Sequence, residues 1–349
     1  MPNVNEPSVL MEAAKRGDRD AFQHLAEQHR RELRLHCYRM LGSIHDAEDA
    51  VQETLLRAWR AVADFEGRTS FRNWLYKIAT HACLNMVTAR QRTARLLPHD
   101  IGPPAQAIPQ EPATEIAWLD PYPDEPIAQL SAIEPGPAAR YESHEAVQLA
   151  FVAAVQRLPP LQRAALLLRD VLGWSAAEAA QLLDTSVASI TSALQRARAT
   201  METSYSSRRS ASVPDERQRE LLDRYVAAWE TADLDNFLAL LKEDAILSMP
   251  PYREWLLGPD AIGRLFAFVC SRYGGSGAFR LVRTAANGQP AFAVYSRSSE
   301  TGDFVAHSIQ VLSLDEDGVA LVVNFRKPEL FEFFGLPLRA IIEKSALCR

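Results

Sequence analysis

Apolar residues recur at helical spacing over residues 11–98, where proline is absent between Arg19 and Leu97 and glycine is rare. The clearest run covers residues 46–63, in which apolar positions step by three or four and form one stripe. The members of this stripe are Ala47, Ala50, Val51, Leu55, Ala58, Trp59 and Val62. Ser43 precedes the run as an N-cap, and acidic residues fill its first turn. The pattern predicts an all-helical domain over residues 11–98.

The same periodicity returns over residues 144–203. It predicts four helical segments, which end near Arg157, Leu172, Leu183 and Met201. Gly173 breaks the chain before the third segment, and Ser175 is a candidate N-cap for it. The sequence therefore predicts a second, smaller all-α domain.

The pattern changes again over residues 215–349. Two helical stretches (216–231 and 234–241) and a helix from Gly258 to Cys270 are interspersed with short β-type runs. These runs cover residues 245–249, 279–284, 291–295, 305–314 and 319–325. Asn287-Gly288 and residues 316–318 are hairpin-turn signals. This order predicts an α+β domain built on an antiparallel sheet.

Residues 99–143 contain nine prolines, and residues 99–146 carry a net charge of −8. Such a composition predicts a linker, because it buries too little apolar surface to offset the entropy of ordering. Trp118 and Tyr122 are the exception. Either they flank a local turn, or they form a short anchor that docks on a neighbouring domain.

The whole chain has 349 residues, a net charge of −6 and four scattered cysteines. It contains no apolar run long enough to span a membrane, no signal-peptide pattern at its start and no CxxC pair. These features favour a reducing, cytoplasmic setting without a membrane span, a disulfide scaffold or a metal site. Residues 1–98 and 147–213 each carry +3, however, while 214–349 carry −4. The two basic blocks keep nucleic acid among the candidate partners.

Residues 175–198 fit a helix-turn-helix. Apolar side chains can pack inward from Ala179, Leu182, Leu183, Val187, Ile190 and Leu194. Short polar or small side chains then point outward, as major-groove recognition needs: Thr185, Ser186, Ala188, Ser189, Thr191, Ser192 and Gln195. Arg196 and Arg198 can reach phosphates. Taken alone, this segment is also compatible with an ordinary helical hairpin.

Two motif blocks resemble bacterial RNA polymerase sigma factors. Residues 46–59 (DAEDAVQETLLRAW), Phe65 and residues 70–80 (SFRNWLYKIAT) are similar to region 2 of these factors. Residues 158–170 (LPPLQRAALLLRD) and the helix-turn-helix are similar to region 4. Because region 3 is missing between them, the chain resembles the extracytoplasmic-function type. The resemblance implies that the chain binds the β and β′ subunits of core polymerase, recognises promoter −35 and −10 elements and initiates transcription.

The resemblance also assigns candidate residues. The polar face of the first helix would bind polymerase through Asp46, Glu48, Asp49, Gln52, Glu53 and Arg57, although such a face alone could simply be solvated. The melted −10 strand would meet Phe65, Arg68, Ser70, Phe71, Arg72, Asn73 and Lys77, with Trp74 and Tyr76 beside them. Aromatic side chains stack on unpaired bases, and cations hold the backbone. We expect Trp74 to be at least half buried, since some of these rings must be core.

One feature departs from the family pattern. Thr191 and Ala193 stand where the recognition helix usually carries basic residues. Fewer phosphate contacts predict weak DNA binding by residues 144–200 alone. The resemblance further implies that the acidic linker threads the RNA-exit channel of the polymerase.

The tail resembles the cone-shaped fold of SnoaL-like polyketide cyclases, ketosteroid isomerases and nuclear transport factor 2. The residues that carry this resemblance are 225–229, Asp233, 244–245, 249–252, 260–262 and 287–291. In sigma factors of this subgroup the tail modulates activity.

Relatives of the tail that are enzymes use acid–base pairs in an apolar pocket. Here only His307 lies in a predicted strand, near Asp303 and with Tyr252 and Tyr295 as possible donors. We predict no catalytic residue, cofactor or metal.

Two alternatives remain for the tail. Its pocket could bind a small ligand, or the tail could present a docking surface that includes Phe331, Phe333, Phe334 and Leu336. Two further alternatives are a ligand-responsive regulator that uses only the helix-turn-helix, and an enzyme carried by the tail.

Overall fold

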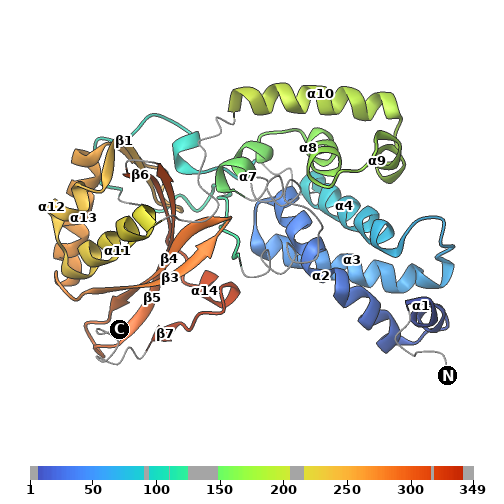
Figure 1. Cartoon of the computed structure of the whole chain (residues 1–349), viewed down its shortest axis with the longest axis horizontal. Helices are drawn as coiled ribbons and strands as arrows, with labels where there is room; N and C mark the ends of the chain where they lie inside the picture. Colours follow the sequence, from blue (N-terminus) through green and yellow to red (C-terminus); the bar gives the residue numbers. More distant parts are fainter. Residues whose placement is uncertain are drawn as a thin grey trace. The chain divides into compact units, whose positions relative to one another are not determined.

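The computed structural model describes residues 7–89, 94–109, 111–124, 148–204, 216–315 and 318–340. The chain divides into two compact units (Figure 1). The helical unit contains Met1–Arg95 and Glu125–Ser206, and the sheet unit contains Leu96–Asp124 and Ser207–Arg349. No helix in the described ranges combines the length and the apolarity that crossing a membrane requires.

The first half of the helical unit is a bundle whose helix ends follow local sequence signals. Asp18 and Ser43 accept backbone N–H groups as N-caps, and Gly42 ends the second helix in the left-handed region at φ 67°. The helices are α1 (Pro7–Lys15), α2 (Arg19–Leu41), α3 (Ile44–Ala61) and α4 (Phe71–Ala89), with a 3₁₀ turn at Val62–Asp64. The predicted stripe residues Ala47, Val51 and Ala58 are fully buried.

The second half of the helical unit contains the predicted helix-turn-helix. Ser175 and Glu178 form a capping box at its first helix, as the sequence indicates. The elements are α7 (Leu149–Gln156), α8 (Pro160–Leu166), a π-helical turn (Leu167–Val171), α9 (Ala176–Leu182) and α10 (Val187–Ser204). Ile190 and Leu194 pack inward as predicted. Val187 does not, since 47% of its surface is exposed at the start of α10.

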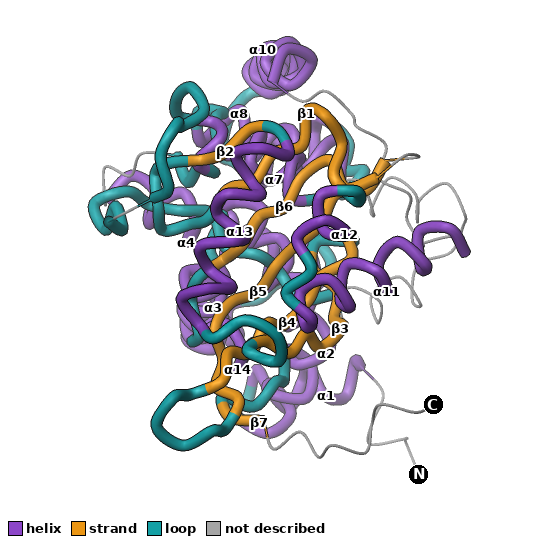
Figure 2. Tube along the Cα trace, turned by 90° about the vertical axis from the view of Figure 1, so that its left-hand side faces the viewer, coloured by secondary structure: helices purple, strands orange, loops and turns teal. Residues whose placement is uncertain are grey.

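The sheet unit places helices α11 (Glu216–Thr231), α12 (Leu234–Leu238) and α13 (Pro259–Tyr273) on one face of a curved sheet (Figure 2). The strand order is β2-β1-β6-β5-β4-β3. The strands are β1 (Leu241–Ser248), β2 (Trp255–Leu257), β3 (Phe279–Ala286), β4 (Gln289–Arg297), β5 (Phe304–Asp315) and β6 (Gly318–Phe325). A short β7 (Arg339–Ala340) pairs with β5, and helix α14 spans Leu330–Phe333.

The prediction of an antiparallel sheet is wrong at one ladder. β1 and β6 run parallel, because the chain between them returns to the same end of the sheet through β2, α13 and the antiparallel strands β3, β4 and β5. The Asn287-Gly288 turn is confirmed, with φ 56° and 68° at its two residues. Glu316 and Asp317 of the second turn signal lie outside the described residues.

Aromatic rings fill the space between the helices and the sheet. Phe237 and Phe266 stack with ring centroids 4.2 Å apart, and Trp229 packs edge-on against both. Tyr225 stacks on Phe292 of β4 at 5.6 Å. The interior of this cone is therefore mainly a packed aromatic core.

Residues 99–124, predicted as part of a linker, and residues 96–98, predicted as the end of the first helical domain, belong to the sheet unit instead. We call residues 96–124 the tether. It begins beside β2, where the Trp255 indole N–H donates to the carbonyl of Gly102 at 2.7 Å. It ends at the β3–β4 turn, where the N–H of Asn287 donates to the carbonyl of Tyr122 at 2.8 Å. The composition argument fails here because these backbone groups find hydrogen-bond partners on the sheet unit.

Trp118 and Tyr122 are both buried, as the anchor interpretation expects. Between them, Asp120 is only 2% exposed and pairs with Lys327 at 2.6 Å. Residues 125–143 of the predicted linker, and residues 144–147 at the start of the second predicted helical domain, lie outside the described residues.

Candidate functional site

The candidate polymerase-binding face lies on α3. Asp49 and Gln52 are exposed, and Glu53 pairs with Arg57 at 2.6 Å on the same face. Glu48 lies closer to the bundle, 3.6 Å from Arg30 and 3.5 Å from Arg34. The helix thus presents a partly acidic surface whose charges are only partly compensated within the chain.

Asp46 does not join this exposed face. Its side chain is 6% exposed and forms an ion pair with Arg95 at 2.6 Å. Asp46 lies in the first turn of α3, where the positive end of the helix dipole stabilises an acidic side chain. Asp46 therefore stabilises the start of α3 and is not part of the exposed face.

Leu56 was not singled out by the sequence, yet 52% of its surface is exposed on α3. It follows Asp49, Gln52 and Glu53 at helical spacing and so shares their face. A large exposed leucine within a polar face is typical of an interaction surface. The position of Leu56 on the helical wheel, outside the buried stripe, was the signal that could have identified it.

The candidate −10 aromatics form one ring cluster beside α4. Phe65 and Trp74 have centroids 5.0 Å apart, and Phe71 lies 5.7 Å from Trp74. All three are partly exposed, and Trp74 is at least half buried as predicted. Tyr76 is buried instead, and its hydroxyl donates to Glu32 at 3.3 Å. Tyr76 is therefore a core residue, and its burial raises the pKa of its hydroxyl.

The polar −10 candidates are mostly held by nearby groups. Arg68 is exposed and pairs with Glu66, while Ser70 caps α4 by accepting the Asn73 N–H at 3.1 Å. Arg72 donates to Glu32 at 2.7 Å. Burial alone would raise the pKa of Glu32, but hydrogen bonds from His29 and Arg72 outweigh it and lower this pKa. Glu32 is therefore a fixed negative charge that orients Arg72.

The candidate −35 residues form a largely exposed row on and before α10. Ser186, Ala188, Thr191, Ser192, Gln195, Arg196 and Arg198 are exposed, and Thr185 and Ser189 are partly exposed. Ser186 accepts the Ser189 N–H at 3.1 Å and so caps the helix. Arg198 forms two hydrogen bonds with Asp170, which raise its pKa. The row has the small, polar surface that major-groove recognition requires.

Helix α4 and the turn of the helix-turn-helix are in direct contact. Lys77 donates to the Asp184 carboxylate at 2.6 Å and to the carbonyl of Gln181 at 3.3 Å. His81 lies 2.8 Å from the carbonyl oxygen of Leu182. The ammonium group of the −10 candidate Lys77 is thus hydrogen-bonded to the turn of the helix-turn-helix.

A second contact joins the two halves at the end of α2. Arg163 of α8 is buried, and its guanidinium donates to the carbonyls of Met40, Gln156 and Leu158. Burial lowers the pKa of Arg163 to about 10, and it stays protonated at neutral pH. The guanidinium meets the negative end of the α2 dipole. These contacts join the two halves of the helical unit.

In the sheet unit the structure does not assemble the acid–base pair considered for His307. The His307 ring contacts the hydroxyl of Tyr273 at 3.2 Å and Arg326 at 3.4 Å, while Asp303 is exposed. Tyr295 donates its hydroxyl to the carbonyl of Pro337. Within the described ranges, no three His, Cys, Asp or Glu side chains gather as metal ligands.

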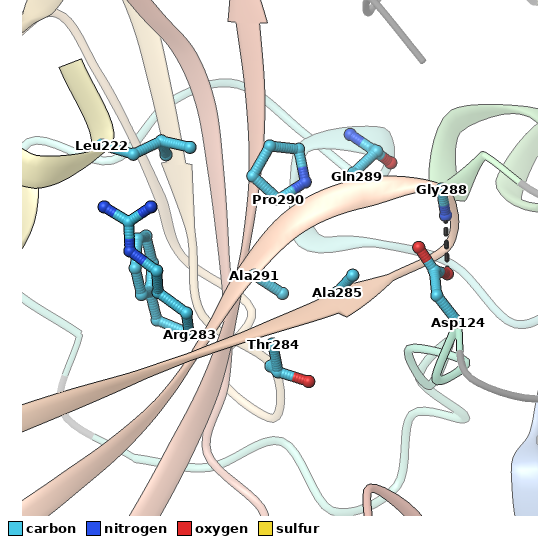
Figure 3. A pocket seen from close by; sticks show the side chains of 10 residues that line it. Asp124, Leu222, Arg283, Thr284, Ala285, Gly288, Gln289, Pro290 and Ala291 are labelled. Carbon is cyan, nitrogen blue, oxygen red and sulfur yellow. Dashed lines mark hydrogen bonds between the residues drawn. The ribbon is translucent and has the colours of Figure 1, made fainter. Parts of the chain in front are cut away.

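A pocket of about 250 Å³ opens where the tether ends (Figure 3). Asp124 lines it together with Thr284 and Ala285 of β3 and Gln289 and Pro290 of β4. The Asp124 carboxylate accepts the Gly288 N–H at 2.8 Å. Burial raises the pKa of Asp124 to about 6. Asp124 therefore couples the end of the tether to the β3–β4 turn.

Three family models match the chain in order. Sigma-70 region 2 matches residues 25–93, Sigma-70 region 4 matches residues 148–201, and the SnoaL-like domain matches residues 222–322. These matches define the class of protein: a sigma factor that carries a SnoaL-like C-terminal domain.

Curated relatives narrow the class. The ECF RNA polymerase sigma factor SigG of Mycobacterium tuberculosis is 44% identical over 93% of this chain and 85% of its own length. SigM of the same species is 30% identical over 54% of this chain and 80% of its own length. The chain belongs to the ECF family of RNA polymerase sigma factors. The crystal structure of the M. tuberculosis extracytoplasmic function sigma factor SigJ shares the fold, with a TM-score of 0.58, 23% identity and coverage of 89% of this chain and 98% of that one.

Proposed function

We propose that this sigma factor holds the β and β′ subunits of core polymerase through the exposed face of α3, formed by Asp49, Gln52, Glu53, Leu56 and Arg57. The observation that supports this most is the exposed Leu56 among acidic and polar residues that the bundle does not bury. A buried apolar anchor surrounded by polar contacts is the usual composition of a protein–protein hot spot.

Promoter binding is proposed for two surfaces of the helical unit. The exposed row on α10 would enter the −35 major groove, with Arg196 and Arg198 on phosphates. Phe65, Phe71 and Trp74 would stack with unpaired −10 bases beside Arg68 and Lys77. Since Lys77 is paired with Asp184 here, the −10 surface becomes fully available only when the two halves separate.

The sheet unit is proposed to modulate activity through the tether, in the cytoplasm where the polymerase acts. Residues 96–124 connect the two DNA-binding halves, and their hydrogen bonds to the sheet unit limit how far those halves can move apart. A regulatory role, rather than catalysis, is supported by the aromatic filling of the cone and by the hydrogen-bond partners of His307 among the described residues, which are Tyr273, Ser308 and the Arg326 cation but no carboxylate.

Promoter-specific run-off transcription with purified core polymerase tests this proposal. The full chain should direct initiation from a cognate promoter, and a Leu56→Asp variant should lose most of that activity. A Leu338→Asp variant is the matched control, because Leu338 is similarly exposed but lies in the sheet unit. A chain that binds promoter DNA tightly without polymerase and supports no initiation would instead be a regulator that uses only its helix-turn-helix.

A further inference from the structure

Val187, the first residue of α10, exposes an apolar side chain on the outer face of that helix, with 47% of its surface accessible. The inner face of α10 is filled by Ile190 and Leu194, which are buried. Thr191 follows Val187 by four residues, so the two are neighbours on the helix surface. Val187 therefore belongs with the candidate −35 row, although its apolar character alone predicted a place in the core.

The hydroxyl groups of the row already have partners within the helix. The Thr191 hydroxyl donates its single hydrogen to the carbonyl of Val187 at 2.9 Å. The Ser192 hydroxyl accepts an N–H of Arg196 at 2.6 Å, and the Ser186 hydroxyl accepts a backbone N–H as the helix cap. At Val187 and Thr191, α10 therefore presents mainly methyl groups to an approaching base edge.

The row also lacks the side chains that most often read guanine. No lysine or arginine occurs between Thr185 and Gln195. Arginine and lysine read guanine through O6 and N7, glutamine pairs with adenine, and apolar side chains contact the C5-methyl group of thymine. Arg198, beyond the row, is held by two hydrogen bonds to Asp170. The chemistry of the row thus favours A·T over G·C base pairs.

We propose that Val187 and the methyl group of Thr191 recognise the C5-methyl groups of thymine in the −35 element. The first residues of a recognition helix contact base edges in the major groove, where thymine alone among the four bases carries a methyl group. Contact between methyl groups removes apolar surface from water. The inference rests on the −35 role proposed for α10 and adds the base that the start of this helix selects.

Replacing thymine by deoxyuridine tests this contact, because it removes one methyl group and keeps every hydrogen-bonding atom. The probe is the promoter duplex from which the holoenzyme, assembled from the full chain and core polymerase, initiates in the run-off assay. Each −35 thymine is replaced in turn, and fluorescence anisotropy gives the dissociation constant of the holoenzyme. We expect one or two positions at which deoxyuridine weakens binding about threefold.

Variants assign the effect to individual methyl groups. Val187→Ser changes an exposed position, so the fold should be kept, and the variant should bind the thymine duplex about threefold more weakly. At one sensitive position it should bind thymine and deoxyuridine equally. Thr191→Val keeps a methyl group and should bind like the parent chain, whereas Thr191→Ser should bind about twofold more weakly. Ala199→Ser removes an exposed methyl group further along α10 and is the matched control, which should discriminate as the parent does.

Failure of this inference and failure of the proposed function give different results. Specific promoter binding that is equal for thymine and deoxyuridine at every −35 position would overturn the methyl contact and leave the −35 role of α10 intact. A folded Val187→Ser variant that still discriminates at every sensitive position would do the same. A holoenzyme that binds no promoter at all would overturn both.

Discussion

Lys77 of α4 donates a hydrogen bond of 2.6 Å to Asp184 in the turn of the helix-turn-helix. The lysine is a candidate −10 residue, and the aspartate precedes the candidate −35 row by one position. The two halves of the helical unit are thus in contact at a candidate DNA-binding residue. Under the function proposed above, this contact has to break before both promoter elements can be read.

Removing the Asp184 charge should expose the −10 surface. Asp184 has φ 49°, so asparagine, which tolerates the left-handed region, is the suitable replacement. The exposed ion pair contributes about 0–1 kcal/mol, and the stability of an Asp184→Asn variant should change little. Its affinity for single-stranded −10 DNA, measured by fluorescence anisotropy, should rise several-fold. Asp170→Asn is the control, and equal gains in both variants would refute a specific role of the Lys77 contact.

Breaking the Lys327–Asp120 pair should release the tether. In a Lys327→Met variant the buried Asp120 carboxylate loses its ion-pair partner, which should cost about 2–3 kcal/mol. Amide exchange across residues 111–124 should accelerate, while exchange in α2 and α3 stays unchanged. If protection of the tether persists in this variant, the ion pair is not what holds it.

The docked end of the tether should weaken as pH rises from about 4 to about 6. The folded-state pKa of Asp124 lies above its usual value of 3.8, so the folded state holds the proton more tightly than the unfolded state. This contribution is present below the unfolded pKa and is lost as pH rises through the folded pKa.

An Asp124→Asn variant keeps an acceptor for the Gly288 N–H but cannot ionise. Above pH 6 it should stabilise the sheet unit by about 3 kcal/mol at most. Thermal unfolding from pH 4 to pH 8 measures this difference. Identical pH profiles for the variant and the parent chain would show that Asp124 does not titrate in this range.

Leu56 should contribute to polymerase affinity without contributing to the fold. Truncating an anchor at an interface commonly costs about 1–2 kcal/mol, so Leu56→Ala should weaken core binding about tenfold. Its melting temperature should match that of the parent chain, because half of the side chain is already exposed. Surface plasmon resonance with immobilised core polymerase measures the affinity. Unchanged affinity would place the interface elsewhere on α3.

The local structure of the chain follows closely from its sequence. The Ser43 and Ser175 caps, the α3 stripe and the Asn287-Gly288 turn depend on neighbours within a few residues, and all are present. Contacts between residues far apart in the chain could not be predicted from such local signals. The burial of Asp46 by Arg95, the parallel pairing of β1 with β6 and the docking of the tether depend on partners 49 or more residues away.

The same distinction between local and long-range contacts separates the candidate residues that were placed correctly from those that were not. Residues on the outer faces of α3 and α10 are exposed, because helical periodicity alone decides which side they occupy. Tyr76 and Val187 were misplaced, since their burial depends on how α4 and α10 meet other helices.

The affinity of core polymerase for a double charge-reversal variant, Asp49→Lys with Glu53→Lys, tests the central claim most directly. Both residues lie on the outer face of α3, and neither is part of the core. The account predicts a loss of at least a hundredfold relative to the parent chain, with Glu27→Lys on α2 as a control that binds normally. Holoenzyme assembly at the affinity of the parent chain would contradict it.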